Sequence, residues 1–406
     1  MSETSLAGIE LSDQFAALAK RRHCVWLDTA AGEGKSLLAA DPFKVIHAKG
    51  TRTEIDGRVV SGHPFDILKA ELACQTGPGV AVGYFGYDLK NQLEKLSAHA
   101  PDDVGLPDLW FGFYAAPTNL HLKHNDPCSE NVNSGGRDWG APRARFTAAV
   151  RRAKEYIAAG DIYQVNLSQR FQTTTAASAP QVYRALRDAN PAPYCAYLDI
   201  GTAQILSSSP ECFLKIDGRH VVTRPIKGTR PRASDPAELL ASPKDNAELL
   251  MITDLERNDL GRVCEFGSVH VPELVRVETY ATVHHLVATV AGTLRPDVSH
   301  VDCIRACFPG GSITGAPKIR AMQIISELEG TTRGPYAGCV GYFSFNGNCD
   351  TAITIRTALV KDGKVFVQAG GGWVTDSDPE AEFQETVNKS KAMRKAVALA
   401  ETFARR

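Results

Sequence analysis

The sequence predicts an α+β protein in which large antiparallel β-sheets form a sandwich flanked by helices. Short β-rich runs recur along the chain, among them CAYLDI, QILSSS, CFLKI and KVFVQA. Asp217 and Gly218 separate two such runs, and Asp-Gly in this position is a strong signal for an antiparallel hairpin. Amphipathic segments with helix start and stop signals lie between the runs.

Length, charge and cysteine content restrict the class of protein. The 406 residues allow a large core, and a formal net charge of -1 offers no basic field for nucleic acid or an anionic membrane. No apolar run is long enough to predict a membrane span, and the first residues do not resemble a secretory signal. Ten cysteines without a CxxC pair indicate reduced, mostly buried thiols. We expect a cytoplasmic protein that acts on small molecules.

Three regions follow one another along the chain. Residues 1–123 mix short strands with helical stretches such as FDILKAELACQ, and we expect an N-terminal α/β region packed on the catalytic unit. Residues 124–143 are rich in Gly, Asn, Ser and Pro, which predicts a flexible surface loop. Residues 144–406 form the expected catalytic region, which begins with a helix that ends at Gly160 and a strand in DIYQVNLSQRFQ.

One acidic pair lies on a helix predicted after residue 242. Ser242 is a good N-cap and Pro243 suits the first helical position. Asp245 lies three residues after the cap, where it is either a capping-box acid or a functional carboxylate. Glu248 lies one turn further on in an apolar run, where an unpaired carboxylate is costly, so we expect it to have a partner.

A second acidic pair lies on the C-terminal helix. Asp378 is its expected cap, and Glu382, Glu385 and Lys389 share one narrow stripe of the helix. Taken alone, Glu385 and Lys389 predict a solvated ion pair. Together, the two acidic pairs suit a hard cation such as Mg2+, which prefers oxygen ligands and retains water molecules that a substrate carboxylate can replace. The spacing does not decide whether the pairs meet in space.

Eight segments in order resemble the chorismate-utilising enzymes, which include anthranilate synthase component I, aminodeoxychorismate synthase component I, and the isochorismate and salicylate synthases. These segments are GDIYQVNLSQRF, ILSSSPECF, RPIKGTRPR, KDNAELLMITDLERNDLGRV, FPGGSITGAPK, RGPYAGCVGYFSFNG, AITIRTA and GGGWVTDSDPEAEFQET. The resemblance is dense over residues 145 to 400 and implies an anthranilate-synthase-component-I-like fold. It also implies that the substrate is chorismate, bound with Mg2+.

Two positions indicate the nucleophile within this resemblance. Members that add water carry a lysine where this chain has Gln164, and an amide cannot take a proton from water, so ammonia is the implied nucleophile. Anthranilate synthases typically read Pro-Ile-Ala-Gly-Thr where this chain reads Pro-Ile-Lys-Gly-Thr, the aminodeoxychorismate synthase pattern. The resemblance implies that Lys227 attacks the ring first and ejects the hydroxyl. Ammonia then takes the place of the C4 hydroxyl, and the product is 4-amino-4-deoxychorismate, a precursor of 4-aminobenzoate and folate.

The resemblance assigns the other site residues by position. Glu211 matches the general acid that protonates the leaving hydroxyl, and His285 matches a histidine near the ring, whereas His284 is expected to be structural. The implied Mg2+ ligands are Glu248, Glu382 and Glu385, with Asp245 where many relatives have Glu. The implied substrate ligands are Tyr336, Arg356, Thr314, Lys389 and the backbone amides of Gly370, Gly371 and Gly372.

The chain departs from the family pattern at Cys212, Gly371 and Trp373. These changes concern the polarity of the pocket and do not touch the proposed catalytic positions. It contains no glutaminase signature, so we expect ammonia from a separate glutamine amidotransferase subunit. Two alternatives stay open, namely anthranilate synthase component I and a catalytically silent binding subunit of the same fold.

The predicted hairpin offers a check on the catalytic pairing. A two-residue turn at Asp217-Gly218 would place Glu211 opposite Arg224, with Lys227 at the same open end. A regular ladder would turn Lys227 to the other face, but Pro225 is expected to break the register there.

Overall fold

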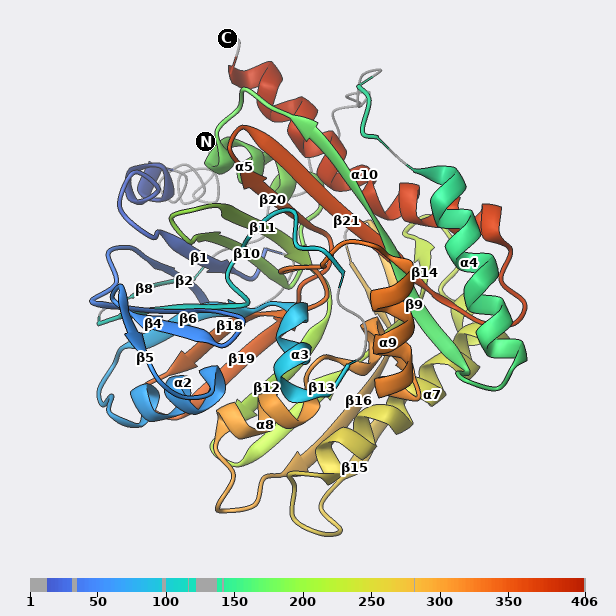
Figure 1. Ribbon diagram of the computed structural model, residues 1–406, viewed down its shortest axis with the longest axis horizontal. Coiled ribbons are helices and arrows are strands. Elements are labelled where there is room, and N and C mark those ends of the chain that lie inside the picture. The colour runs from blue at the N-terminus through green and yellow to red at the C-terminus, as the bar shows by residue number, and fades with distance from the viewer. Residues whose placement is uncertain are drawn as a thin grey trace.

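The computed structural model describes residues 13–30, 35–96, 100–115, 117–121, 137–140, 142–280 and 282–404. Within these residues the chain builds two antiparallel sheets, here called sheet A and sheet B (Figure 1). Sheet A has nine strands, in the order β17 (Gly315–Ala316), β9 (Gln164–Thr174), β21 (Lys364–Trp373), β20 (Thr357–Lys361), β11 (Gln204–Ser209), β10 (Tyr194–Asp199), β1 (Val25–Asp28), β2 (Lys35–Ala39) and β8 (Thr118–His121).

Sheet B has twelve strands within the same described ranges. Eleven follow the order β14 (Ile226–Pro231), β16 (Val283–Thr293), β13 (His220–Arg224), β12 (Cys212–Asp217), β19 (Asn348–Ile353), β18 (Cys339–Ser344), β6 (Val80–Phe85), β7 (Leu109–Tyr114), β3 (Lys44–Lys49), β4 (Arg52–Ile55) and β5 (Arg58–Val60). The remaining strand, β15 (His270–Thr279), pairs with β16.

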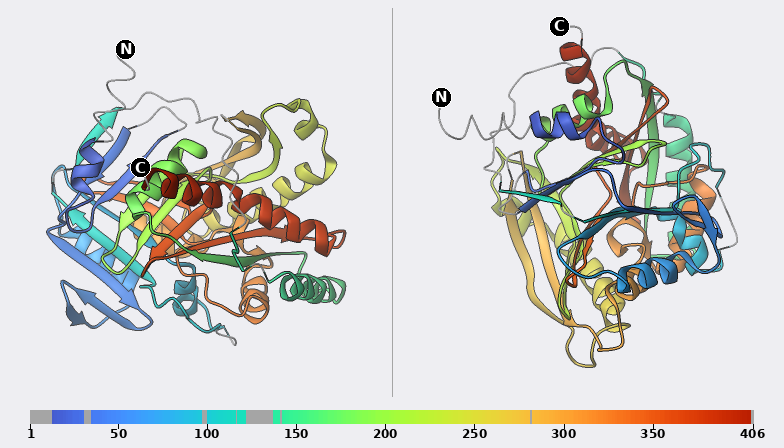
Figure 2. Two further views of the ribbon diagram at one scale, coloured as in Figure 1. Left: turned by 90° about the horizontal axis from the view of Figure 1, so that it is seen from above. Right: turned by 90° about the vertical axis from the view of Figure 1, so that its left-hand side faces the viewer.

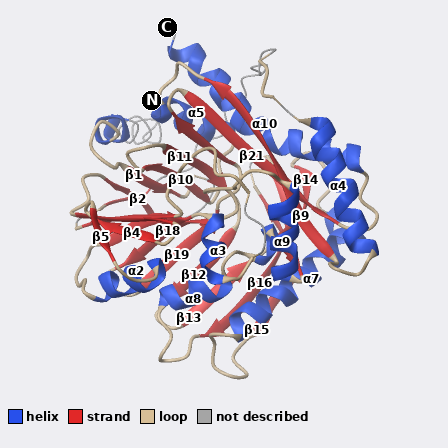
Figure 3. Cartoon of the chain, in the orientation of Figure 1, coloured by secondary structure: helices blue, strands red, loops and turns tan. Residues whose placement is uncertain are grey.

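Helices surround the sheets (Figure 3). They are α2 (Pro64–Ala73), α3 (Lys90–Leu93), α4 (Arg143–Ala158), α5 (Ala179–Ala189), α6 (Ala237–Leu240), α7 (Pro243–Gly261), α8 (His300–Cys307), α9 (Lys318–Leu328) and α10 (Pro379–Ala404), with short 3-10 turns at Tyr87–Leu89 and Gly311–Ile313. None of the helices in the described part of the chain has the length and apolarity needed to cross a membrane.

The two sheets pack face to face, which confirms the predicted sandwich. One buried cluster joins Val25 and Leu198 of sheet A to Val82, Trp110 and Val340 of sheet B. A second cluster joins the other face of sheet A to α5 and α10, and a third joins sheet B to α2 and α8. Figure 2 shows α10, coloured red, beside β21. Helices therefore cover the outer faces, and apolar side chains of the two sheets pack against each other between them.

The N-terminal segment supplies strands to both sheets. Its strands β1, β2 and β8 extend sheet A, and β3 to β7 form one end of sheet B. The pairing is long-range, because Val25 on β1 lies opposite Leu198 on β10. Most of the loop predicted over residues 124–143 lies outside the described residues.

The hairpin after β12 exists, but its register differs from the prediction. Asp217 pairs with His220, and Cys212, rather than Glu211, lies opposite Arg224. The reason is that Gly218 and Arg219 form the two-residue turn, one residue later than predicted, and a β-bulge between Cys212 and Lys215 offsets only part of this shift. Glu211 therefore lies just beyond the end of the paired ladder.

The caps of the two acidic helices are as predicted. The Ser242 hydroxyl accepts a hydrogen bond from the backbone N–H of Asp245 at 3.3 Å, at the start of α7. The Asp378 carboxylate accepts hydrogen bonds from the backbone N–H groups of Glu380 (3.1 Å) and Ala381 (2.8 Å), at the start of α10. These caps satisfy N–H groups that a helix cannot pair internally. The nine cysteines within the described residues are free thiols, and all but Cys74 are buried.

Candidate active site

The side chains that the sequence marks as functional gather around one cavity of about 840 Å³. Its walls come from β14 and β16 of sheet B, from β9 and β21 of sheet A, and from α7 and α10. Twelve of the fifteen predicted site residues line it, namely Glu211, Lys227, Asp245, Glu248, His285, Tyr336, Arg356, Gly370, Gly372, Glu382, Glu385 and Lys389. The fold thus brings together segments separated by more than half of the chain.

The other three predicted residues do not border the cavity. The Gln164 side chain is buried directly behind Gly372, and its Nε2 has no hydrogen-bond partner among the described residues. Thr314 is fully buried, and its hydroxyl donates to the Gly310 carbonyl at 2.9 Å. A Cβ on Gly371 would point toward Glu385 and Lys389, on the α10 side of β21. Thr314 therefore supports the cavity wall instead of facing a ligand.

Lys227 reaches the cavity because the strand that carries it is broken twice. Pro225 separates β13 from β14, and both strands pair with β16. Gly228 has a φ of 70°, a left-handed conformation that suits glycine, and it forms a bulge just after Lys227. A regular strand would have turned Lys227 to the opposite face, so these two interruptions orient the ammonium group.

The Lys227 ammonium lies among charged groups in a largely closed site. Its side chain is 12% exposed, and Nζ lies 4.0 Å from Oε2 of Glu248. Burial lowers the pKa of Lys227, and the nearby Lys389 adds to this effect, while Glu248 opposes it. Burial disfavours the charged form of an amine, so a larger share of Lys227 is present as the free, nucleophilic amine.

Glu211 lies on the same cavity wall between β11 and β12. It is 4% exposed, and its Oε1 has no partner among the described residues. Burial raises the pKa of Glu211, and the neighbouring Ser312 hydroxyl and Lys227 ammonium oppose the rise. A carboxyl group that keeps its proton can serve as an acid, which is the role that the resemblance implies.

The predicted acidic pair on α7, Asp245 and Glu248, already has basic partners. Asp245 Oδ2 accepts a hydrogen bond from Arg230 at 2.9 Å, and Asp245 is therefore not the reciprocal acid of a capping box. Glu248 has its expected partners, because its two carboxylate oxygens lie 4.0 Å from Lys227 and from Lys244. Both carboxylates also line the cavity.

On α10, the predicted stripe forms a charged cluster at the cavity. Burial and the adjacent Glu385 raise the pKa of Glu382 to about 7. Burial also works against ionisation of Glu385, but Lys389, whose Nζ lies 2.6 Å from Oε1, lowers the pKa of Glu385 below its usual value. Across the described ranges, no three His, Cys, Asp or Glu side chains form a group that could hold a metal ion as they stand.

Arg356 and Tyr336 supply the groups suited to carboxylates. Arg356 has an unusual φ of 51°, and the Ser208 N–H holds its carbonyl at 3.1 Å. Its guanidinium lies within 4.0 Å of no acidic side chain in the described part of the chain, and burial lowers the pKa of Arg356. Burial also raises the pKa of Tyr336, whose hydroxyl stays protonated as a hydrogen-bond donor. An unpaired arginine beside a buried tyrosine is a site for an anion.

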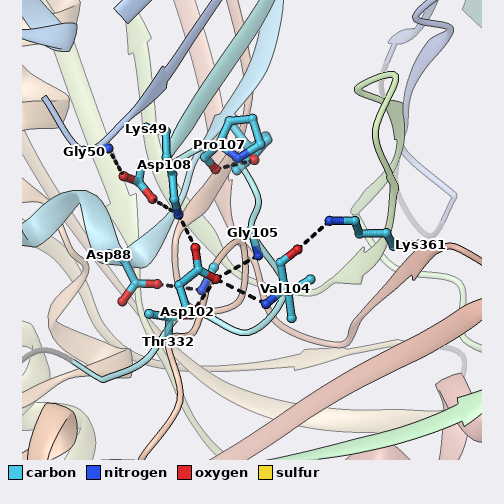
Figure 4. A network of polar contacts seen from close by, with 12 residues as sticks. Lys49, Gly50, Asp88, Asp102, Val104, Gly105, Pro107, Asp108, Thr332 and Lys361 are labelled. Atoms are coloured by element: carbon cyan, nitrogen blue, oxygen red, sulfur yellow. Dashed lines mark hydrogen bonds and ion pairs between the residues drawn. The ribbon is translucent and has the colours of Figure 1, made fainter. Parts of the chain in front are cut away.

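Two polar networks hold the loop that carries Tyr336. Thr332 donates to Asp102 at 3.2 Å (Figure 4). The N–H of Gly334 donates to Asp88 at 2.7 Å. Lys49 forms a further ion pair with Asp102 at 2.5 Å. The loop is therefore tied on its outer side to segments of the N-terminal region.

Arg333 holds the same loop from the inner side. It is 3% exposed, pairs with Glu329 at 2.7 Å, and donates to the carbonyls of Ile313 (2.9 Å) and Asn166 (2.6 Å). Its guanidinium also lies 5.8 Å from the ring centre of Tyr336. The buried guanidinium of Arg333 therefore joins three walls of the cavity. No motif in the sequence predicted this role.

The two adjacent histidines have different surroundings. His285 lines the cavity, its Nδ1 lies 3.0 Å from the Thr229 hydroxyl, and burial together with Arg356 lowers the pKa of His285 to about 4. His285 is therefore neutral at physiological pH. His284 is fully buried, and its ring nitrogens contact Thr279 (2.8 Å) and the Arg232 carbonyl (3.1 Å), so it acts in packing.

Several cavity residues were not predicted from the sequence. They are polar side chains on elements already assigned to the site, namely Asn166, Arg230, Lys244, Ser312 and Gln368. Asn166 follows Gln164 by two residues on β9, so strand periodicity alone would have placed it on the same face. The departures Cys212 and Trp373 are buried and do not line the cavity.

The chain was compared with known proteins by sequence. A family model described as chorismate binding enzyme matches residues 22–395. Anthranilate synthase component 1 of Thermus thermophilus is 45% identical over 363 residues, which cover 80% of this chain and 78% of that protein. Aminodeoxychorismate synthase component 1 of Escherichia coli is 44% identical over 386 residues, which cover 88% of this chain and 83% of that protein. The two names therefore occur at nearly equal identity.

The comparison with solved structures agrees. Anthranilate synthase component I from Streptococcus pneumoniae TIGR4 superposes with a TM-score of 0.81 at 33% identity, over 91% of this chain and 93% of that one. This chain therefore has the anthranilate-synthase-component-I-like fold that the resemblance implied. The chain belongs to the chorismate-binding enzyme family, and within it to the type formed by component I of anthranilate synthase and of aminodeoxychorismate synthase.

Proposed function

We propose that this chain is an aminodeoxychorismate synthase component I, which converts chorismate and ammonia to 4-amino-4-deoxychorismate. The observation that carries the proposal is the primary amine of Lys227, which lies in the cavity wall near the buried carboxyl of Glu211. The names of the relatives do not choose between the two reactions, so the choice rests on this lysine, where anthranilate synthases typically have alanine.

The two groups divide the first step between them. The amine of Lys227 forms a bond to a ring carbon, the ring double bonds shift, and the C4–oxygen bond breaks. Glu211 gives its proton to the departing hydroxyl, which leaves as water. The environment suits both roles, because burial raises the pKa of Glu211 and lowers the pKa of Lys227.

Substrate binding is assigned to the anion-binding groups of the cavity. Chorismate carries two carboxylates, and Arg356 offers a planar guanidinium that lacks an acidic partner within the described residues. Tyr336 donates a hydrogen bond from the same wall, and Lys389 lies beside Gly370, to whose carbonyl it donates at 2.9 Å. A cavity of about 840 Å³ has ample volume for such a small molecule.

We further propose Mg2+ as the cofactor, held by Glu248 on α7 and by Glu382 and Glu385 on α10. The donor set fits, because its members are carboxylates on two helices that line one cavity. Glu382 and Glu385 also repel each other, which a cation would relieve. Mg2+ retains several waters and needs only one or two direct carboxylates, so it does not require a tighter cluster. When bound, the ion supplies positive charge to a substrate carboxylate.

A glutamine amidotransferase subunit is the proposed source of ammonia. The relatives are named as component 1, which implies a second component, and no glutaminase signature occurs in this chain. Glutamine-dependent product formation by this polypeptide alone would contradict the proposal. Activity with free ammonium would remain, because the amination chemistry belongs to this chain.

The test is product identification with purified protein, chorismate, Mg2+ and ammonium chloride. We expect 4-amino-4-deoxychorismate without pyruvate, and a loss on the order of 10³-fold or more in Lys227→Ala, because the nucleophile is removed. Lys215→Ala is the matched control, since Lys215 is exposed on β12 outside the cavity. Formation of anthranilate and pyruvate would favour the anthranilate synthase alternative. Absence of any product would favour a silent subunit.

A further inference from the structure

Asn166 places an amide in the wall of the cavity that also contains the proposed nucleophile. It lies on β9 opposite Gly372 of β21, two residues after Gln164. A Cβ on Gly370 would lie only 3.0 Å from Asn166 Oδ1, and a Cβ on Gly372 would lie 3.3 Å from Lys227 Nζ. The two glycines therefore leave space on one face of β21 that the Asn166 amide and the Lys227 ammonium both approach.

The orientation of the Asn166 amide follows from its neighbour. The amide nitrogen donates to the backbone carbonyl of Ser312 at 3.3 Å. A carbonyl can only accept, so the nitrogen must face Ser312 and Oδ1 must face away from it. Oδ1 is buried and receives no hydrogen bond from the residues that the structure describes. An unpaired buried amide oxygen is unfavourable, and a ligand that donates a hydrogen bond to it would remove this cost.

Glu211 supplies a second buried oxygen that has no hydrogen-bond partner among the described residues. The Ser312 hydroxyl lies beside the Glu211 carboxyl, and Asn166 binds the Ser312 carbonyl, so both side chains flank Ser312 at the cavity wall. Oε1 of Glu211 also lacks a partner in the described part of the chain. Two buried oxygens on residues of the cavity wall, from different elements, thus have no hydrogen-bond donor among the described residues.

We propose that Asn166 Oδ1 binds the ammonia that attacks the ring, by accepting one of its N–H groups. This inference rests on the proposed aminodeoxychorismate synthase activity and adds a residue to it. Ammonia carries three N–H donors and one lone pair, so it can donate to Asn166 and to Glu211 while its lone pair points at the ring.

Chorismate itself is a poor match for this oxygen. Its carboxylates and ether oxygen only accept hydrogen bonds, as Oδ1 does. Its single hydroxyl donor must receive a proton from Glu211 and leaves in the first step. After that step the substrate itself offers no donor to Asn166, whereas ammonia brings three.

The second step balances with these groups in place. Ammonia forms the C4–nitrogen bond, the ring double bonds shift back, and the carbon–Nζ bond to Lys227 breaks. The electron pair of that bond returns to Nζ, and one proton passes from the incoming nitrogen to the departing amine. The products are 4-amino-4-deoxychorismate and free Lys227, and Asn166 contributes a hydrogen bond without exchanging a proton.

The experiment separates formation of the Lys227 adduct from its reaction with ammonia. Full-length protein is mixed with chorismate and Mg2+ without ammonium, and intact mass spectrometry follows a mass gain of chorismate less one water. Ammonium chloride is then varied to obtain the KM for ammonia. In Asn166→Leu, which removes the acceptor at similar volume, we expect adduct formation to persist and the KM for ammonia to rise about ten-fold, the value of one hydrogen bond.

Gln172→Leu is the matched control, because it makes the same change at an exposed position on the same strand. An unchanged KM for ammonia in an Asn166→Leu protein that forms the adduct would overturn the inference. If that variant forms no adduct, Asn166→Ala is tested in the same way, and loss of the adduct in both would assign Asn166 to chorismate binding instead. Absence of the adduct in the wild type would overturn the proposed function itself, and this inference with it.

Discussion

Replacing Gly372 with alanine is expected to disable the site while the protein stays folded. A Cβ there would collide with Nε2 of Gln164 and lie 3.2 Å from its Cδ and 3.3 Å from Nζ of Lys227. Gln164 is 2% exposed and has little room to retreat. We expect the amide and the amine to shift by about 1 Å, a displacement that lowers a catalysed rate about a hundred-fold. Overpacking of this kind costs about 1–3 kcal/mol of unfolding free energy.

The assay for Gly372→Ala is chorismate amination at saturating ammonium, with a urea titration to measure the free energy of unfolding. Gly261→Ala is the control, because a Cβ there meets no atom within 4 Å and Gly261 ends the helix that carries Glu248. Gly371→Ala should lose much less activity than Gly372→Ala, since its nearest contacts are at 3.6 Å. Activity of Gly372→Ala within about three-fold of the wild type would refute the steric argument.

Two further predictions concern stability. Burial raises the pKa of Glu256 to about 8 from 4.5, against the Thr223 hydroxyl and with help from Glu211, so the folded state binds a proton that the unfolded state releases between these pH values. The free energy of unfolding should fall as pH rises through this window, by on the order of 5 kcal/mol from this group. Glu256→Gln should reduce the slope measured by urea titrations at several pH values, while Glu382 keeps its own contribution. An unchanged slope in this variant would contradict the assignment. Arg333→Met should lower the free energy of unfolding by about 3–5 kcal/mol, because it leaves Glu329 buried without its cation. Arg333→Lys should lower it less. A loss below about 1 kcal/mol in Arg333→Met would contradict this interpretation of the ion pair.

Local signals predicted the elements better than their partners. Ser242 and Pro243 mark the start of α7, and Asp378 marks the start of α10, because caps are satisfied by residues close in sequence. The alternation of a strand shows which of its faces is buried, but not which distant strand it joins. For this reason the placement of β1 beside β10 could not be predicted, although both strands could.

The register of the Glu211 hairpin failed for a related reason. The turn lies at Gly218 and Arg219 instead of Asp217 and Gly218, and a bulge between Cys212 and Lys215 offsets only part of this shift. Neither feature has a clear signal in the local sequence. The error has a physical consequence, since a regular hairpin would have held Glu211 in the ladder instead of beyond its end. Pro225, by contrast, carries its signal in its own chemistry, because it lacks the N–H that a ladder requires.

Most of the site residues that sequence reasoning identified carry charge or a titratable group. The side-chain types of Lys227, Glu211 and Arg356 themselves indicate a chemical role. Gly372 has no side chain, which leaves the space that Gln164 and Lys227 occupy. Asn166 has a buried amide oxygen that receives no hydrogen bond from the described residues. Such roles depend on neighbours from other strands and appear only when the strands are assembled. A sequence pattern can therefore identify the charged groups of this cavity, whereas the space beside Gly372 and the unpaired oxygen of Asn166 have to be found in three dimensions.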